Sequence, residues 1–319
     1  MRKTIARANA NIALIKYWGK FDEENVIPYQ PSISITLDNM YTVTTIEESD
    51  HFSFILNGKE EGESEKKKVF NFLLNFASIE EINKVKIISE NFLPTAAGLA
   101  SSSSGYAALS TSANNYFNKF YDLKTLANIT RKGSGSACRS LVGGFVAWEV
   151  NGEVYQVGSV YDDFVIISVI INSNKKKISS REAMKITVKT SPFYENWVME
   201  TKRDFYKMIE AINSGNLDEI GRLTEKSYSL MHATMLSSNP PILYMSSESL
   251  KVIDLVLKMR NEGIYAYSTL DAGENVKILT RVSDAKKIIE NLNNEGLTNL
   301  NISKMGEGAQ VIYDSKVWS

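Results

Sequence analysis

A serine-rich stretch between residues 94 and 109 has the composition best suited to binding an anion. It reads Pro-Thr-Ala-Ala-Gly-Leu-Ala-Ser-Ser-Ser-Ser-Gly-Tyr-Ala-Ala-Leu and follows an apolar run at 85–88. Apolar residues at helical spacing come next, which predicts a strand, a tight loop and a helix that begins at a serine. Amide groups at a helix start bind phosphate, and serine hydroxyls can donate to phosphate or ligate Mg²⁺. A loop that only caps its helix is the alternative. No Gly-Lys-Ser/Thr follows the glycine, which excludes a Walker loop.

A short basic and aromatic cluster lies near the start of the chain. Lys16, Tyr17 and Lys20 surround a Trp-Gly turn. Two ammonium groups and a phenol this close together can hold a multiply charged anion. A solvated basic patch is the alternative that the spacing leaves open.

A second candidate anion site is the stretch Arg-Lys-Gly-Ser-Gly-Ser-Ala-Cys-Arg that ends at Arg139. Ser134, Gly135 and Ser136 could present amides and hydroxyls to an anion. Arg139 offers a planar fork that suits a carboxylate. The Gly-x-Gly pattern is a weak signal for a dinucleotide, because no strand precedes it and a cysteine stands where the third small residue is expected.

A candidate catalytic carboxylate lies in the stretch Ser-Thr-Leu-Asp-Ala-Gly-Glu-Asn. Asp271 follows a short strand-like run and precedes Ala-Gly. An aspartate that simply starts a turn is the alternative, and turn propensity favours it.

Composition limits the function classes. The chain has 319 residues, 43% of them hydrophobic and 23% charged, as in soluble globular proteins of one large or two ordinary domains. The formal net charge of −1 argues against a nucleic-acid partner, and no apolar run approaches the ~18 residues of a membrane span. The start lacks the apolar region of a signal peptide, so we expect a cytoplasmic protein.

Cysteine and histidine are scarce. The single cysteine, Cys138, excludes an intramolecular disulfide and a cysteine-based zinc cluster. Its small neighbours favour a packing residue over a nucleophile. With only His51 and His232 present, a histidine-ligated metal site is not expected.

The elements that must position these groups alternate hairpins with helices. Asn-Gly at 57–58 and at 151–152 predicts two tight hairpins. Periodicity and end signals predict helices over 66–77, 190–213, 216–235, 247–262 and 283–295. Apolar runs predict strands over 164–171, 264–268, 276–279 and 310–313. This order is not βαβαβ, which favours an α+β fold over a doubly wound sheet.

A composition shift predicts where the chain divides. Three lysines at 175–177 and two serines at 179–180 follow the apolar run that ends at 171. We therefore expect an N-terminal domain over 1–180 and a C-terminal domain over 181–319, with a last strand that can return to the N-terminal domain.

Together, and in this order, the motifs resemble those of one family. The matching stretches are residues 10–20, 94–102, 133–140, 187–191, 232–234 and 271–275. By them the chain is identified as a member of the mevalonate diphosphate decarboxylase family, in the GHMP-kinase superfamily. The resemblance implies a two-domain α+β fold with a ribosomal-S5-like, ATP-binding N-terminal domain, a ferredoxin-like C-terminal domain and an active site in the cleft between them.

The resemblance also implies the reaction. ATP with Mg²⁺ phosphorylates the 3-hydroxyl of mevalonate 5-diphosphate, and loss of that phosphate with CO₂ gives isopentenyl diphosphate. Asp271 would face the 3-hydroxyl with Lys16 as its charge partner, and Arg139 would pair with the substrate carboxylate. The residues implied for the rest of the substrate are Tyr17, Lys20, Ser134, Gly135, Ser136 and Ser191.

The nucleotide and its metal complete the implied site. The ATP phosphates would be held by Ala97, Gly98, Leu99, Ala100, Ser101, Ser102 and Ser103. Mg²⁺ would lie at Ser102 and Asp271.

The chain departs from the family pattern near the phosphate end of the substrate. It has Gln-Pro-Ser-Ile-Ser at 30–34 where the family has Asn-Ser-Ser-Leu-Ser, and Glu274 where a proline is common. An arginine found in many relatives is replaced by a lysine, Lys67 or Lys68.

These departures leave alternatives open. A decarboxylase of mevalonate 5-phosphate and a mevalonate 3-kinase remain possible within the family. A nucleic-acid-binding module is the alternative from another class, and the net charge disfavours it. A homodimer is expected from the base rate for such enzymes.

Overall fold

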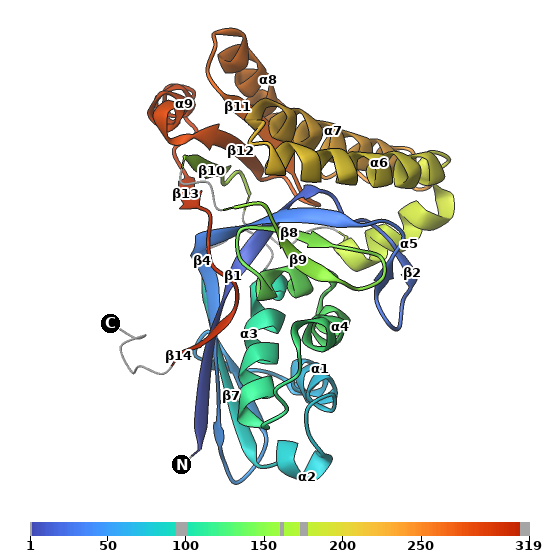
Figure 1. Ribbon diagram of the computed structural model, residues 1–319, viewed down its shortest axis with the longest axis vertical. Coiled ribbons are helices and arrows are strands. Elements are labelled where there is room, and N and C mark those ends of the chain that lie inside the picture. The colour runs from blue at the N-terminus through green and yellow to red at the C-terminus, as the bar shows by residue number, and fades with distance from the viewer. Residues whose placement is uncertain (1, 94–100, 160–162, 173–177, 313–319) are drawn as a thin grey trace.

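The structure has two parts, each built on its own sheet, stacked along the long axis of the molecule (Figure 1). The computed structural model describes residues 2–93, 101–159, 163–172 and 178–312. We call the large sheet with its helices the N-terminal domain and the smaller sheet with its helices the C-terminal domain. In the described ranges no helix is long and apolar enough to cross a membrane.

The N-terminal domain is organised by two long paired strands. β1 (Lys3–Ile15) and β4 (Ser32–Glu48) are antiparallel, and the main path of the sheet is β14-β1-β4-β7-β5-β6, with β8 and β9 added beside β4. The other strands are β5 (Ser53–Leu56), β6 (Lys59–Glu60), β7 (Val85–Phe92), β8 (Phe145–Trp148), β9 (Val154–Val157) and β14 (Gln310–Ile312), with β2 (Lys20–Asp22) and β3 (Ile27–Pro28) forming a separate ribbon. The register of β1 against β4 shifts between Ala13 and Ile15, a bulge-like feature just before Lys16.

Helices cover one face of this sheet. They are α1 (Glu63–Leu73), α2 (Ile79–Ile82), α3 (Ser101–Tyr116), α4 (Leu123–Gly133) and the 3₁₀ helix η1 (Gly135–Leu141). Phe72 of α1 and Leu109 of α3 share a buried core with Phe76, in the turn after α1, and with the strand residues Val146 and Trp148. This core fixes the position of η1, which follows α4 directly.

The C-terminal domain contains an antiparallel sheet of strand order β11-β12-β10-β13. Its strands are β10 (Phe164–Val169), β11 (Ala266–Leu270), β12 (Val276–Arg281) and β13 (Leu300–Lys304), and its helices are α5 (Ser180–Thr190), α6 (Tyr194–Asn213), α7 (Leu217–Leu236), α8 (Ser247–Asn261) and α9 (Val282–Asn294). The succession of one strand, helices, two strands, a helix and a strand is that of a ferredoxin-like unit.

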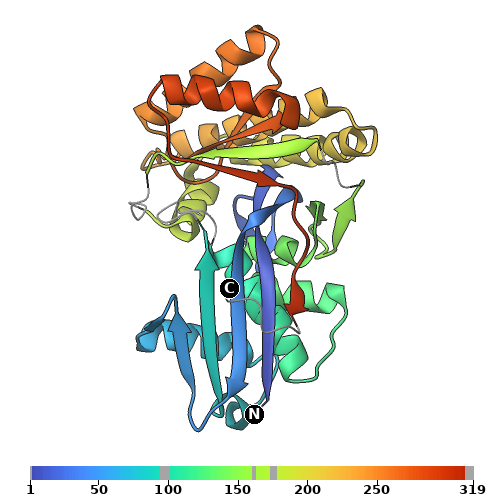
Figure 2. The same ribbon diagram turned by 90° about the vertical axis from the view of Figure 1, so that its left-hand side faces the viewer.

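The two faces of this sheet pack against different partners. Ile167 lies in a core with residues of α8 and α9, whereas the adjacent Ile166 lies in a core with α6, α7 and residues of the N-terminal domain. That second core, which includes Leu14 and Phe145, joins the domains. Figure 2 shows the small sheet lying across the end of the large one.

The end of the chain returns to the N-terminal domain. After β13 it runs past β4, where the amide of Gly306 donates to the Thr36 carbonyl at 2.8 Å, and then pairs with β1 as β14. A Cβ on Gly306 would lie 2.7 Å from the backbone of Leu37, so this crossing requires a glycine. The return of the last strand is therefore observed.

Both Asn-Gly hairpins are confirmed, as β5–β6 and β8–β9. The predicted helix over 190–213 is wrong at its start, because α5 ends at Thr190 before Pro192 and α6 begins only at Tyr194. The predicted seam at 180 stays a prediction. By hydrogen bonding alone the C-terminal sheet begins earlier, at Phe164.

Candidate functional site

Asp271 and Lys16, 255 residues apart in sequence, form an ion pair where the two domains meet. Asp271 follows the last residue of β11, and Lys16 follows the last residue of β1. The Lys16 Nζ donates to Asp271 Oδ1 at 2.7 Å, and the Nζ of Lys277, on β12, donates to Oδ2 at 3.0 Å. The side chains of Lys16 and Lys277 are 1% and 4% exposed, but that of Asp271 is 38% exposed. One edge of the carboxylate therefore remains open to solvent.

The charges around Asp271 keep it ionised. Burial alone would raise the pKa of this carboxyl, but Lys16 and Lys277 outweigh burial and hold the pKa well below its usual range. Burial lowers the pKa of Lys16 to about 8, although Asp271 acts in the opposite direction. Burial and the charge of Lys16 also lower the pKa of His232, on α7, to about 4. At neutral pH Asp271 is thus an anion beside a neutral imidazole.

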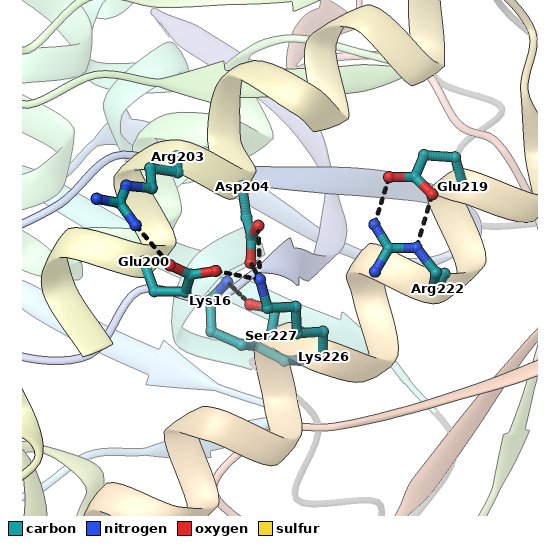
Figure 3. Close-up of polar contacts among 8 residues, drawn as sticks. All are labelled: Lys16, Glu200, Arg203, Asp204, Glu219, Arg222, Lys226 and Ser227. Atoms are coloured by element: carbon teal, nitrogen blue, oxygen red, sulfur yellow. Dashed lines mark hydrogen bonds and ion pairs between the residues drawn. The ribbon is translucent and has the colours of Figure 1, made fainter. Parts of the chain in front are cut away.

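α7 holds the backbone of Lys16 in place. The Lys16 amide donates to Ser227 Oγ at 2.9 Å. Figure 3 shows the adjacent Lys226 between Glu200 and Asp204 of α6, with a 2.9 Å contact to Asp204. The ion pair joins α6 to α7, and α7 in turn holds the backbone at the end of β1 through Ser227.

Arg139 is a buried cation that pairs with no carboxylate in the part of the chain that the structure describes. It lies in η1, is 2% exposed, and donates from Nε and Nη2 to Asn11 Oδ1 at 3.3 and 3.1 Å and from Nη1 to Ser32 Oγ at 2.8 Å. Among the described residues no carboxylate lies within ion-pair distance of it. Burial lowers the pKa of Arg139, yet a guanidinium keeps its charge. Such a group favours an anionic ligand.

Tyr17 and the turn before η1 form a small polar group. The Tyr17 hydroxyl has no hydrogen-bond partner among the described residues, and burial raises its pKa well above the usual range. A Cβ on Gly135 would lie 2.9 Å from that hydroxyl, so glycine allows the turn to approach the ring. Ser134 Oγ lies 3.2 Å from Ser102 Oγ, which joins this turn to the start of α3. Ser136 accepts a hydrogen bond from Asn11 Nδ2 at its backbone carbonyl.

Lys20 lies in a basic group that includes Arg181, a residue that the sequence interpretation missed. The Lys20 Nζ is 3.4 Å from Glu23, burial lowers the pKa of Lys20, and Arg181 lowers it further. Arg181 also acts on Tyr17. No local signal marked Arg181, because the sequence did not predict the start of α5, and its effect on Tyr17 depends on where that helix lies.

Several predicted residues are not joined to this group. Ser191 caps the other end of α5, where its hydroxyl lies 2.8 Å from Ser237 Oγ, and no described contact connects it to Tyr17 or Lys20. Ala97, Gly98, Leu99 and Ala100 lie outside the described residues. Ser101 opens α3, Ser102 is exposed and Ser103 is buried. Their roles stay predictions.

Cys138 is a packing residue. It is buried and free, its thiol donates to the Gly135 carbonyl at 3.1 Å, and burial raises its pKa to about 12. A thiol held protonated at neutral pH is a poor nucleophile.

The two candidate Mg²⁺ contacts differ in how well they suit a cation. Both oxygens of Asp271 accept hydrogen bonds from ammonium groups, and that positive surrounding disfavours a further cation. Ser102 offers an exposed hydroxyl at the start of a helix, which suits an ion bound together with phosphates. Within the described residues no cluster of His, Cys, Asp and Glu could hold a metal by itself.

Comparisons with known proteins agree with this arrangement. A model described as the diphosphomevalonate decarboxylase-like N-terminal domain matches residues 8–159. A second, the mevalonate 5-diphosphate decarboxylase C-terminal domain, matches residues 165–315. The chain belongs to the diphosphomevalonate decarboxylase family.

Members of this family from distant organisms match most of the chain. The diphosphomevalonate decarboxylase of Debaryomyces hansenii is 36% identical over 313 residues, covering 89% of this chain and 81% of its own. That of Danio rerio is 35% identical over 303 residues, covering 85% and 74%.

Solved structures confirm the two-domain fold that the resemblance implied. Mevalonate diphosphate decarboxylase from Staphylococcus aureus superposes with a TM-score of 0.91 at 38% identity, covering 98% of both chains. The complex of MDDEF with MVAPP, AMPPCP and magnesium gives 0.90 at 37% identity, covering 97% of this chain and 98% of that one.

Proposed function

We propose that this chain catalyses the ATP-dependent decarboxylation of (R)-mevalonate 5-diphosphate, in the mevalonate pathway of isoprenoid biosynthesis. The products are isopentenyl diphosphate, ADP, phosphate and CO₂. The observation that carries the proposal is an ionised Asp271 near a buried Arg139 that pairs with no carboxylate among the described residues. Membership of the decarboxylase family supports the same reaction.

Asp271 is proposed to align the 3-hydroxyl of the substrate. That hydroxyl is a tertiary alcohol with a high pKa and so a poor nucleophile. The open edge of the carboxylate can accept its hydrogen bond, while the buried lysines hold the other side. Alignment and electrostatics from one well-placed group contribute roughly 3–4 kcal/mol to the lowering of the barrier.

Arg139 is proposed to bind the carboxylate that leaves as CO₂. Its two contacts with Asn11 and one with Ser32 fix the guanidinium plane. A fixed fork holds the carboxylate so that the breaking C–C bond is oriented for loss of CO₂ with the 3-phosphate.

The diphosphate is assigned to the basic group around Tyr17. Lys20 supplies an ammonium group, Tyr17 supplies a neutral hydroxyl without a partner among the described residues, and the turn at 134–136 supplies amides and hydroxyls. Arg181 adds a guanidinium that forms no ion pair with the described residues, and it joins Ser191 as a candidate on α5.

The reaction uses ATP and Mg²⁺, in line with the AMPPCP and magnesium in the related complex. Within the described residues the start of α3 fits these groups, because the hydroxyls of Ser102 and Ser134 face each other there. Residues 97–103 would hold the phosphates and Ser102 the metal, whose positive charge offsets the charge of the phosphates.

The substrate is tested by offering three compounds in parallel with ATP and Mg²⁺: mevalonate, its 5-phosphate and its 5-diphosphate. We expect CO₂, ADP and phosphate in equal amounts, and only with the 5-diphosphate. CO₂ from the 5-phosphate would reassign the chain to a monophosphate decarboxylase, and ADP without CO₂ would make it a 3-kinase. Absence of turnover with all three contradicts the proposal.

A cytoplasmic location and a homodimer belong to the same proposal. The homodimer is tested by light scattering on purified protein, where a mass near 71 kDa is expected from the 35.7 kDa chain doubled. The single-chain mass would contradict it.

A further inference from the structure

Lys277 is a lysine in the middle of a sheet, with its side chain only 4% exposed. Burial of an ammonium group costs free energy unless the charge is paired. Within the described residues, Asp271 is the partner with which Lys277 forms an ion pair, at 3.0 Å from Oδ2. The sequence offered no signal for this lysine, and the proposed function gives it no role beyond its charge beside Asp271.

The strand register explains how Lys277 reaches Asp271. Lys277 lies directly opposite Thr269 on β11, so their side chains share one face of the sheet. Asp271 comes two residues after Thr269 and continues on that face. The contact is therefore a diagonal cross-strand pair, set by the hydrogen bonds between β11 and β12.

The two lysines hold Asp271 from different domains. Lys16 extends from β1 of the N-terminal domain and binds Oδ1, whereas Lys277 belongs to the same sheet as Asp271 and binds Oδ2. The Lys16–Asp271 contact depends on how the domains meet. The Lys277–Asp271 contact lies within the C-terminal sheet, so it does not depend on the other domain.

We propose that Lys277 is a positioning residue for Asp271, which it holds through Oδ2 so that the exposed carboxylate edge faces the substrate hydroxyl. The role rests on the proposed function of Asp271. We expect no contact between Lys277 and the substrate, because its side chain is only 4% exposed and its ammonium group binds Asp271 Oδ2. Without it, Asp271 would keep only the contact with Lys16 and could rotate to offer both oxygens to that ammonium group.

The test compares Lys277→Met and Lys277→Arg with the wild-type enzyme. Misplacement of a reacting group by about 1 Å can cost about 100-fold in rate, so we expect kcat of Lys277→Met to fall about 100-fold. The KM for ATP and for mevalonate 5-diphosphate should change less than about threefold, since Lys277 touches neither. Lys277→Arg should recover part of the lost kcat. A lysine that only stabilised the fold would lower the melting temperature without this split between kcat and KM.

Lys251→Met is the matched control, because Lys251 lies on the surface of the same domain and pairs only with the exposed Glu295 among the described residues. Its kcat should equal that of the wild type. If Lys277→Met keeps kcat within about threefold of the wild type, the role is refuted.

A crystal structure of Lys277→Met gives a second readout that needs no turnover. We expect the Asp271 side chain to rotate toward Lys16, and an unmoved carboxylate would overturn the inference. An inactive wild type would instead count against the proposed function, while the crystal structure would still decide the role of Lys277. If Lys277→Met does not fold, Lys277→Gln serves the same comparison, because its side chain carries no charge to pair with Asp271.

Discussion

At the scale of single residues, the site depends on the charge of Lys16. Its pKa is lowered from 10.5 to about 8, chiefly by burial, so its proton is lost at a lower pH than in a free lysine. Above that pH Asp271 keeps its ion pair with Lys277 but loses the ion pair with Lys16 of the N-terminal domain.

We therefore expect kcat/KM to fall as pH rises through about 8, because the fraction of Lys16 that is charged decreases. Lys16→Arg keeps the charge to much higher pH and should remove this decline, even if its kcat at neutral pH is lower. A pH–rate profile with the same alkaline decline in both enzymes would show that another group titrates.

Three of the catalytic candidates could be predicted because each lies in a motif with local meaning. Lys16 precedes the Trp-Gly turn, Arg139 closes a small-residue turn and Asp271 ends a strand. Lys277 and Arg181 could not be found this way. The role of Lys277 depends on the register of two strands, and that of Arg181 on where α5 lies relative to Tyr17. Neither relation is visible in local sequence.

At the scale of elements, the pair α6 and α7 supports the end of β1 through an ion-paired contact. Asp204 is buried, and Lys226 lies 2.9 Å from it while also contacting Glu200 (Figure 3). Removal of the lysine leaves a buried carboxylate uncompensated.

Lys226→Met should lower the free energy of unfolding by about 3 kcal/mol, at the low end for a buried pair because Lys226 is partly exposed. Urea denaturation measures this change. Lys202→Met, a substitution at an exposed lysine of the same helix pair, should stay within about 0.5 kcal/mol of the wild type. Equal effects of the two substitutions would show that the Lys226–Asp204 ion pair does not stabilise the fold.

The elements were predictable where turn chemistry or apolar periodicity marks them. The hairpins follow from Asn-Gly, and α7, α8 and α9 from their apolar faces. β4 was missed because its buried positions include Thr42, Thr44 and Thr45, whose polarity hides a core strand. β13 was missed for a similar reason, since its sequence Leu-Asn-Ile-Ser-Lys has little apolar content.

At the scale of the whole molecule, the buried His232 links stability to pH. Burial and Lys16 lower its pKa from 6.5 to about 4, so between these values the unfolded chain binds a proton that the folded chain does not. The contribution of the neutral His232 to the free energy of unfolding is therefore fully present above about pH 6.5. It is lost as the pH falls toward 4.

Between pH 6.5 and 4 the free energy of unfolding should fall by about 3 kcal/mol through His232, since each pKa unit corresponds to about 1.4 kcal/mol. Urea denaturation at several pH values between 6.5 and 4 measures it. His232→Gln, which has no titrating imidazole, should show a flatter dependence in this range. The same slope in both proteins would assign the effect to other groups.

At the junction of the two domains, lysines from both hold one ionised carboxylate, Asp271, which we propose acts on the reacting hydroxyl. Asp271→Asn tests this most directly, because the amide is nearly the same size but carries no charge. We measure CO₂ release from mevalonate 5-diphosphate with ATP and Mg²⁺, together with the melting temperature and substrate affinity of both proteins. We predict a loss of about 100- to 1,000-fold in kcat, with substrate binding retained. A variant that folds, binds and still releases CO₂ within about tenfold of the wild-type rate would contradict it.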